Sequence, residues 1–144
     1  MSIRPQSIVE TVVDFLAVSP VLTGKVTSFF DLNFMSETNR ISYPAVGVSY
    51  LGMSSDNKGT GRAATLFMDI YIIGDTTCLN SKEKMARLWE ILTETREALL
   101  CQRNDVVGGL RVWRFIHEVP IDVDGQGSNN RAAYRQRFST VVVL

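Results

Sequence analysis

The stretch GMSSDNKGTG, residues 52–61, is the first segment whose residue types could bind a ligand. A phosphate-binding P-loop ends in glycine, lysine and then serine or threonine, so that backbone N–H groups hold the phosphates and the hydroxyl group reaches Mg²⁺. Here Asn57 occupies the position of that glycine, and Gly59 the position of the hydroxyl residue. Such a loop must also open a helix, but residues 63–73 are rich in β-branched and aromatic side chains, which favour a strand. We therefore predict a polar connection between two strands.

The only histidine, His117, and the acids Asp122 and Asp124 are the next candidates for catalysis or metal binding. A lone histidine on a strand is more often structural or part of an interface than a general base, and no Gly-x-Ser-x-Gly motif accompanies it. A calcium loop of the EF-hand type needs a closing glutamate, which the residues after Asp124 do not supply. The two cysteines form no metal-binding pattern, which suits a reducing compartment. We expect no catalytic residue, no metal and no cofactor, and keep a small enzyme acting near His117 as an alternative.

Arginines interleaved with aromatic residues near the C-terminus are a possible nucleic-acid surface. Arg135 and Arg137, on either side of Gln136, would share one face of a strand, and Arg111 would join them if the neighbouring strand aligns. However, 15 Lys and Arg residues balance 15 Asp and Glu residues, so the chain has no net charge with which to attract nucleic acid or an anionic membrane. We therefore favour the interpretation that these arginines pair with acids on a neighbouring strand or subunit.

The N-terminal segment is predicted to form a helix over about residues 5–18. Ser7 and Glu10 have the spacing of a capping box, apolar residues recur at helical spacing, and Ser19-Pro20 would stop the helix. The same apolar run is interrupted by Glu10 and Asp14, so it fits neither a signal peptide nor a membrane span. We expect a soluble protein made in the cytoplasm.

A second helix is the most strongly patterned element of the chain. Asn80 and Glu83 can cap its start, and residues 104–109 end it. One side is charged and is predicted to face solvent, because it carries Lys84, Arg87, Glu90, Glu94 and Glu97. The other side is apolar and is predicted to face the core: Met85, Leu88, Trp89, Leu92 and Leu99.

Five further segments are predicted as strands. The element order is then α-β-β-β-α-β-β, in a single domain over residues 1–144 without internal repeat or linker. This order indicates an α+β fold, a mostly antiparallel sheet with two main helices packed on it. Hydrophobic residues make up 45% of the chain and charged residues 21%, as in ordinary globular proteins. The predicted strands are residues 25–34, 43–51, 63–73, about 110–119 and about 133–143.

The predicted strand 110–119 is apolar on both of its sides. A strand that is covered on one face only should alternate between apolar and polar residues. It is therefore either a central strand with protein on both sides, or a strand whose one side meets another subunit. Leu110, Val112 and Ile116 form one side; Trp113, Phe115 and Val119 form the other, and His117 is predicted on the side of Trp113 and Phe115.

The strands YPAVGVSY (residues 43–50) and TLFMDIYII (residues 65–73) have a residue pattern that resembles one known family. Together with the opening amphipathic helix, the long helix and the closing pair of strands, they resemble the tail terminator (tail completion) proteins of tailed bacteriophages. The resemblance spans nearly the whole chain and rests on the order, length and texture of the elements, without a catalytic motif.

That resemblance implies a non-enzymatic virion protein of the tail neck. It would form a ring with copies of itself, usually a hexamer, that caps the last ring of tail-tube subunits and stops tube growth. The ring would then offer a docking surface to the head-side connector or head-completion protein, with the tail sheath as a further possible partner. DNA would only pass through the lumen, and no membrane is involved.

By position, the resemblance makes residues 53–62 and 121–130 candidate loops for contacting partners. Another neck or head–tail joining component is the alternative of similar size, followed by a small nucleic-acid-binding module that relies on the arginines. The candidate loop residues are Met53, Asp56, Asn57, Lys58, Arg62, Asp122, Asp124, Asn129 and Asn130. The candidate inter-subunit or lumen-facing residues are Arg111, Trp113, Phe115, Arg135 and Arg137.

Overall fold

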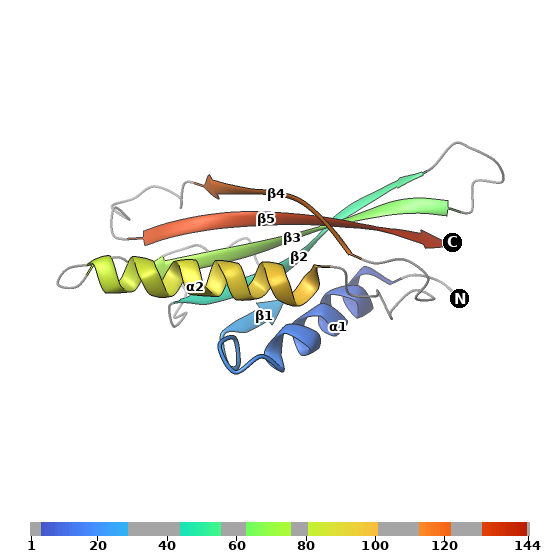
Figure 1. The fold of residues 1–144 in the computed structure, drawn as a ribbon. Coiled ribbons are helices and arrows are strands. Elements are labelled where there is room, and N and C mark those ends of the chain that lie inside the picture. Colours follow the sequence, from blue (N-terminus) through green and yellow to red (C-terminus); the bar gives the residue numbers. More distant parts are fainter. Residues whose placement is uncertain are drawn as a thin grey trace.

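Two helices pack on one face of a five-stranded sheet (Figure 1). This computed structural model describes residues 4–28, 44–55, 63–75, 81–100, 113–121 and 131–143. The predicted α+β class, a mostly antiparallel sheet with two main helices packed on it, is confirmed. The helices are α1 (Pro5–Ala17) and α2 (Ser81–Leu99). The strands are β1 (Val26–Ser28), β2 (Ala45–Ser55), β3 (Ala63–Asp75), β4 (Arg114–Ile121) and β5 (Arg131–Val143).

The strands lie in the order β1-β2-β3-β5-β4. Neighbours among β2, β3, β5 and β4 are antiparallel, and β1 runs parallel to β2. Of the predicted strand 25–34, only Val26–Ser28 is described as a strand, and residues 29–34 lie outside the described part of the chain. Because β4 lies at an edge of the described sheet, the central-strand explanation for its two apolar sides is wrong.

Helix α1 begins earlier than a capping box at Ser7 requires. Its N-cap is Arg4, which makes no side-chain capping hydrogen bond, and Pro5 follows it directly. Proline suits the first helical position, because its φ is already helical and its missing N–H would have no partner there. Ser7 therefore lies inside the first turn, and the predicted capping box is wrong. Residues Ile8, Val9, Val12 and Leu16 form the buried side of the helix.

Strand β2 continues past the point where the sequence predicts a loop. It pairs with β3 as far as Ser55, through a bulge between Tyr50 and Gly52. Gly52 has a φ of 144°, which side-chain-bearing residues rarely adopt. Met53, predicted to lie in the connecting loop, is therefore a strand residue opposite Leu66.

Helix α2 buries a stripe that differs from the predicted one at Trp89. Leu88, Leu92 and Leu99 are buried as predicted, whereas Trp89 is 53% exposed. Successive residues of a helix are turned by about 100°, which carries Trp89 out of the stripe centred on Leu88. Ile91, on the other side of Leu88, is buried instead.

Polar groups also fasten α2 to the sheet. The amide nitrogen of the fully buried Gln136 in β5 donates to the carbonyl of Leu92 and to Oε1 of Glu118, both at 2.8 Å. The same Glu118 oxygen accepts from Arg96 of α2 at 3.1 Å. These contacts hold one side of α2 against the edge strand β4.

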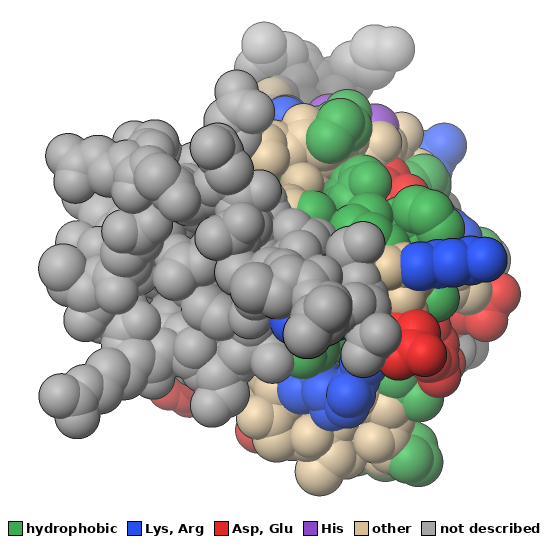
Figure 2. Space-filling view, turned by 90° about the vertical axis from the view of Figure 1, so that its left-hand side faces the viewer, with side chains coloured by type: hydrophobic (Ala, Val, Ile, Leu, Met, Phe, Trp, Pro, Cys, Tyr) green, Lys and Arg blue, Asp and Glu red, His purple; other side chains and the backbone are tan. Residues whose placement is uncertain are grey.

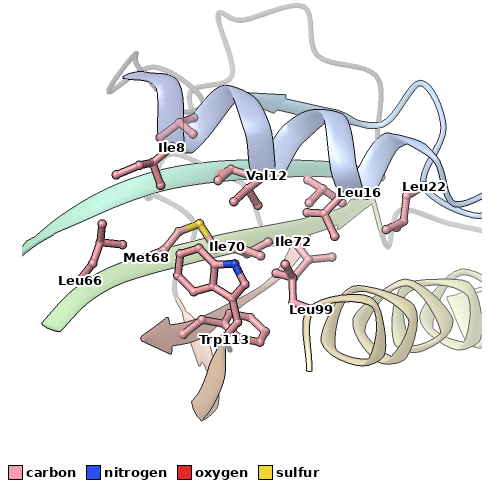
Figure 3. Close-up of a cluster of buried hydrophobic side chains, with 14 of the residues drawn as sticks. Ile8, Val12, Leu16, Leu22, Leu66, Met68, Ile70, Ile72, Leu99 and Trp113 are labelled. Carbon is pink, nitrogen blue, oxygen red and sulfur yellow. The ribbon is translucent and has the colours of Figure 1, made fainter. Parts of the chain in front are cut away.

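The core lies between the helices and the sheet (Figure 3). Ile8, Val12 and Leu16 of α1 point towards the sheet, where residues such as Met68 and Ile70 of β3 meet them. Full burial of an aliphatic side chain of this size contributes about 1.5–3 kcal/mol. This apolar layer fixes which face of each strand is left for polar residues.

Candidate functional site

The sheet face turned away from the helices carries two of the predicted arginines. Directly opposite residues of an antiparallel pair share a face. Arg137 lies opposite Asp69 of β3 and opposite His117 of β4, while Arg135 lies opposite Tyr71. The neighbouring Phe138 belongs to the helix-covered face, because it is part of the core. We call Asp69, Tyr71, His117, Arg135 and Arg137 the arginine face.

Arg137 is held by Asp69 in a two-point ion pair. Nε of Arg137 donates to Oδ1 at 2.8 Å, and Nη2 donates to Oδ2 at 3.0 Å. The Asp69 side chain is only 1% exposed and that of Arg137 is 25% exposed. The hydrogen bonds to Asp69 raise the pKa of Arg137 above its usual value. This ion pair is the pairing with an acid on a neighbouring strand that the sequence favours. Two nitrogens of the Arg137 guanidinium are therefore already bound to Asp69.

Arg135 is only partly engaged. It hydrogen-bonds the side chain of Tyr71, whose pKa is raised above its usual value by burial and by the charge of Asp69, against the lowering effect of Arg135. Nε of Arg135 and Nε2 of His117 are buried and have no hydrogen-bond partner. A buried nitrogen is costly to leave unpaired, so this face has unused hydrogen-bonding capacity, and Nε of Arg135 is a donor that a carboxylate or another acceptor can satisfy.

His117 lies on the other face from the one predicted. Phe115 is opposite Phe138, but His117 is opposite Arg137, because a bulge at Ile116 breaks the alternation. An extra residue in a strand reverses the faces of all residues beyond it. His117 therefore joins the arginines and does not share the side of Phe115.

Trp113 and Phe115 contact their own core. Trp113 is 4% exposed and belongs to the core cluster. Phe115 packs edge-to-face against Phe138, with ring centroids 5.6 Å apart. Trp113 is therefore part of the subunit's own core, whereas Phe115 is only partly buried.

The predicted loop residues are described only in part. Met53 is 38% exposed on β2. The other candidates lie outside the described residues, so the structure neither groups nor separates them, and the alignment of Arg111 with the other arginines is likewise not described. They are Asp56, Asn57, Lys58, Arg62, Arg111, Asp122, Asp124, Asn129 and Asn130.

Sequence reasoning missed Asp69 and Tyr71, which organise the arginine face. The sequence feature that could have indicated them is Asp69 itself, a single acid within the apolar run of residues 65–73, because a charge in the interior of a sheet needs a partner. It also missed the Gln136–Glu118–Arg96 contacts, for which the signal was a lone glutamine between two arginines that face the other way.

A groove of about 550 Å³ lies between the turn after α1 and helix α2. Its lining includes the basic residues Lys25 and Arg87 and the acidic residues Glu83 and Glu90, so it carries both signs of charge. None of the buried unpartnered atoms of the described residues belongs to it. The arginine face is therefore the stronger candidate site.

Two kinds of feature are absent from the described residues. No three His, Cys, Asp or Glu side chains in that part of the chain gather to hold a metal ion. No helix within the same residues combines the length and apolar character that crossing a membrane requires.

Comparison with protein-family models gives no match, and comparison with curated proteins gives none either. The fold and the residues of this chain therefore carry the functional argument.

Proposed function

We propose that this chain is a non-enzymatic virion assembly protein of a tailed bacteriophage. Copies of it form a ring that caps the tail tube, stops tube polymerisation and provides the docking surface for the head-side connector. The ring belongs to the tail neck and assembles in the host cytoplasm. DNA passes through its lumen and is not read by sequence.

The single observation that supports this proposal most is the position of β4. It lies at an edge of the described sheet, and Ile116 at its bulge is 43% exposed. Exposed apolar residues on an edge strand favour aggregation unless a partner covers them. A protein that works inside an assembly has such a partner.

The arrangement of elements is a second support. Helix α1, the β2–β3 hairpin, helix α2 and the closing β4–β5 pair follow one another in the order on which the resemblance to tail terminators rests. The engagement of Arg137 by Asp69 also weakens the alternative of a nucleic-acid-binding module, because a paired guanidinium contributes little to phosphate binding.

The experiment is a tube-length assay with the tail-tube protein of the same phage. Tube protein is polymerised with and without the purified chain, and tube lengths are measured by electron microscopy, with an equal mass of albumin as the control. We expect shorter tubes that carry density at one end. Unchanged lengths without co-sedimentation would contradict the proposal.

The same preparation separates the nearest alternative. A chain that binds the connector protein but not the tube would be another neck or head–tail joining component. Pull-downs with tube protein and with connector protein, run separately, distinguish these two outcomes.

A further inference from the structure

The sheet face turned away from the helices carries more positive than negative charge. Arg114 lies on this face beside the arginine face, because it is opposite Ser139, two residues along β5 from Arg137. Among the strand side chains that the structure describes, this side of the sheet therefore holds three arginines and His117 but a single acid, Asp69.

The acids near these arginines are already engaged or lie elsewhere. Asp69 binds Arg137 through both of its carboxylate oxygens. Glu118 is on the helix-covered side, where helix α2 binds it. The acids of α1 and α2 lie with their helices on that same side of the sheet (Figure 1). Within the described residues, Arg114 and Arg135 therefore have no acid as an ion-pair partner.

Arg135 keeps an unpaired hydrogen-bond donor on this face. Its Nε is buried without a partner, although the side chain hydrogen-bonds Tyr71. Nε2 of His117, which is opposite the neighbouring Arg137, is buried and unpaired as well. The side chains of Arg135 and His117 are both partly exposed, so a change of rotamer can bring these nitrogens to the surface. Figure 2 shows His117, the only histidine of the chain, at the upper rim of the molecule.

The accessible part of this face runs from Arg135 towards Arg114. At the other end, Ile73 and Ala133 are buried, whereas Ser139 is partly exposed and Arg114 is exposed. Arg114 is opposite Ser139, four residues along β5 from Arg135, so the rows of the two arginines are about 14 Å apart at about 3.4 Å per residue. An extended peptide has the same rise, and its side chains four positions apart share one face at that spacing.

We propose that this face binds an acidic, extended segment of a partner protein. Arg135 receives one carboxylate, and Arg114 receives a second carboxylate about four positions along the segment. A planar carboxylate fits two donors of a guanidinium. The Asp69–Arg137 pair, in the row next to Arg135, holds a carboxylate on this face in that way.

A protein segment suits this face better than a nucleic acid does. The 15 Lys and Arg residues balance the 15 Asp and Glu residues, so the chain has no net charge to attract a polyanion. Apolar residues also share the rows of the two arginines, because Val119 is opposite Arg135 and Phe67 is opposite Ser139. Both are partly exposed and can contact apolar groups of a peptide. Binding of such a segment goes beyond the proposed function and does not depend on it.

The probe is a fluorescent peptide of threonine and serine with two glutamates about four positions apart. Its binding is measured by fluorescence anisotropy at low salt, and the same peptide with glutamine at both positions is the control ligand. Arg135→Gln removes the residue that receives the first carboxylate, and Arg114→Gln changes an exposed position. Arg87→Gln, at an exposed position of α2, is the matched control variant. Circular dichroism checks the fold of each variant.

We expect the wild type and Arg87→Gln to bind the glutamate peptide equally and the glutamine peptide not at all. Arg135→Gln should weaken binding about tenfold or more, because hydrogen bonds between charged groups are lost. Arg114→Gln should weaken binding about two- to fivefold, as is typical for the loss of an exposed ion pair.

A wild type that does not bind the glutamate peptide, or either folded variant of the face that binds it like the wild type, would overturn this site. Tighter binding of a thymidine oligonucleotide than of the peptide would assign the face to nucleic acid and reject the proposal. Self-association that Arg135→Gln abolishes, without peptide binding, would assign the face to a second copy and reject it as well.

The tube-length assay is read separately from peptide binding. A chain that shortens tubes but does not bind the glutamate peptide would retain the proposed function and lose only this site. A chain that binds the peptide through Arg135 but leaves tube lengths unchanged would retain this site and lose the proposed function.

Discussion

The two partners of the Asp69–Arg137 ion pair differ in how much stability is lost when the other is removed. The carboxylate is almost fully buried, whereas a quarter of the Arg137 side chain reaches water. Removing the arginine leaves a buried charge without its ion-pair partner, which typically costs about 3–5 kcal/mol. Removing the carboxylate leaves a guanidinium that water can partly solvate, and the loss is that of charged hydrogen bonds, about 1.5–3 kcal/mol.

We therefore predict that Arg137→Met lowers the free energy of unfolding more than Asp69→Asn does, as measured by urea denaturation. Methionine keeps the apolar stem of the arginine, and asparagine keeps the shape of the aspartate. Lys82→Met, at an exposed position of α2, should stay within about 0.5 kcal/mol of the wild type. Equal losses for the two pair variants would argue against a buried carboxylate at Asp69.

Tyr71 gives the arginine face a pH dependence. Its pKa in the folded protein lies above the usual 10.0, mainly because burial disfavours the charged phenolate. The contribution of this raised pKa to the free energy of unfolding is fully present below pH 10 and is lost as the pH rises through the pKa of Tyr71 in the folded protein. We predict that the difference in unfolding free energy between the wild type and Tyr71→Phe shifts against the wild type above about pH 10. Parallel pH profiles would contradict this.

At the residue scale, the sequence predicts the ion-pair partner of an arginine better than the sheet face on which each residue lies. The alternation around Gln136 correctly puts Arg135 and Arg137 on one face, and the expectation of an acidic partner on a neighbouring strand holds for Arg137. The face of His117 could not be predicted, because it depends on a bulge that no residue type near Ile116 announces.

The sequence pattern predicts the presence of each helix and strand more reliably than the residues at which it begins and ends. The stripe Leu88, Leu92 and Leu99 predicts α2, and the runs in β2 and β3 predict an antiparallel pair. The lengths of β2 and β3 were underestimated, because pairing with β3 and β5 holds polar residues such as Ser54 in a strand that their own propensity does not favour.

The β2 bulge is the element feature most sensitive to a single change. A side chain at position 52 would meet no atom within 4 Å, so the cost of adding one lies in the backbone, whose φ is 144°. We predict that Gly52→Ala costs about 1–3 kcal/mol of stability by urea denaturation.

Ser54→Ala, two residues further along β2 and exposed, is the matched control and should change stability by less than about 0.5 kcal/mol. If Gly52→Ala is as harmless as the control, β2 does not require this backbone conformation.

At the scale of the whole molecule, we propose a protein that acts through its surfaces, and the proposal depends on the order of the strands in the sheet. No single sequence feature predicts that Ile116 is exposed on an edge strand, because the edge position of β4 depends on the strand order. The parallel placement of β1 beside β2 and the edge position of β4 are tertiary facts.

The most direct test of the central claim is the mass of the particles that the wild-type chain forms, measured by native mass spectrometry with tail-tube protein present and absent. We predict a closed assembly of several 16.1 kDa copies, bound to tube protein when it is added. A 16.1 kDa monomer that binds no tube protein at any concentration would contradict the claim.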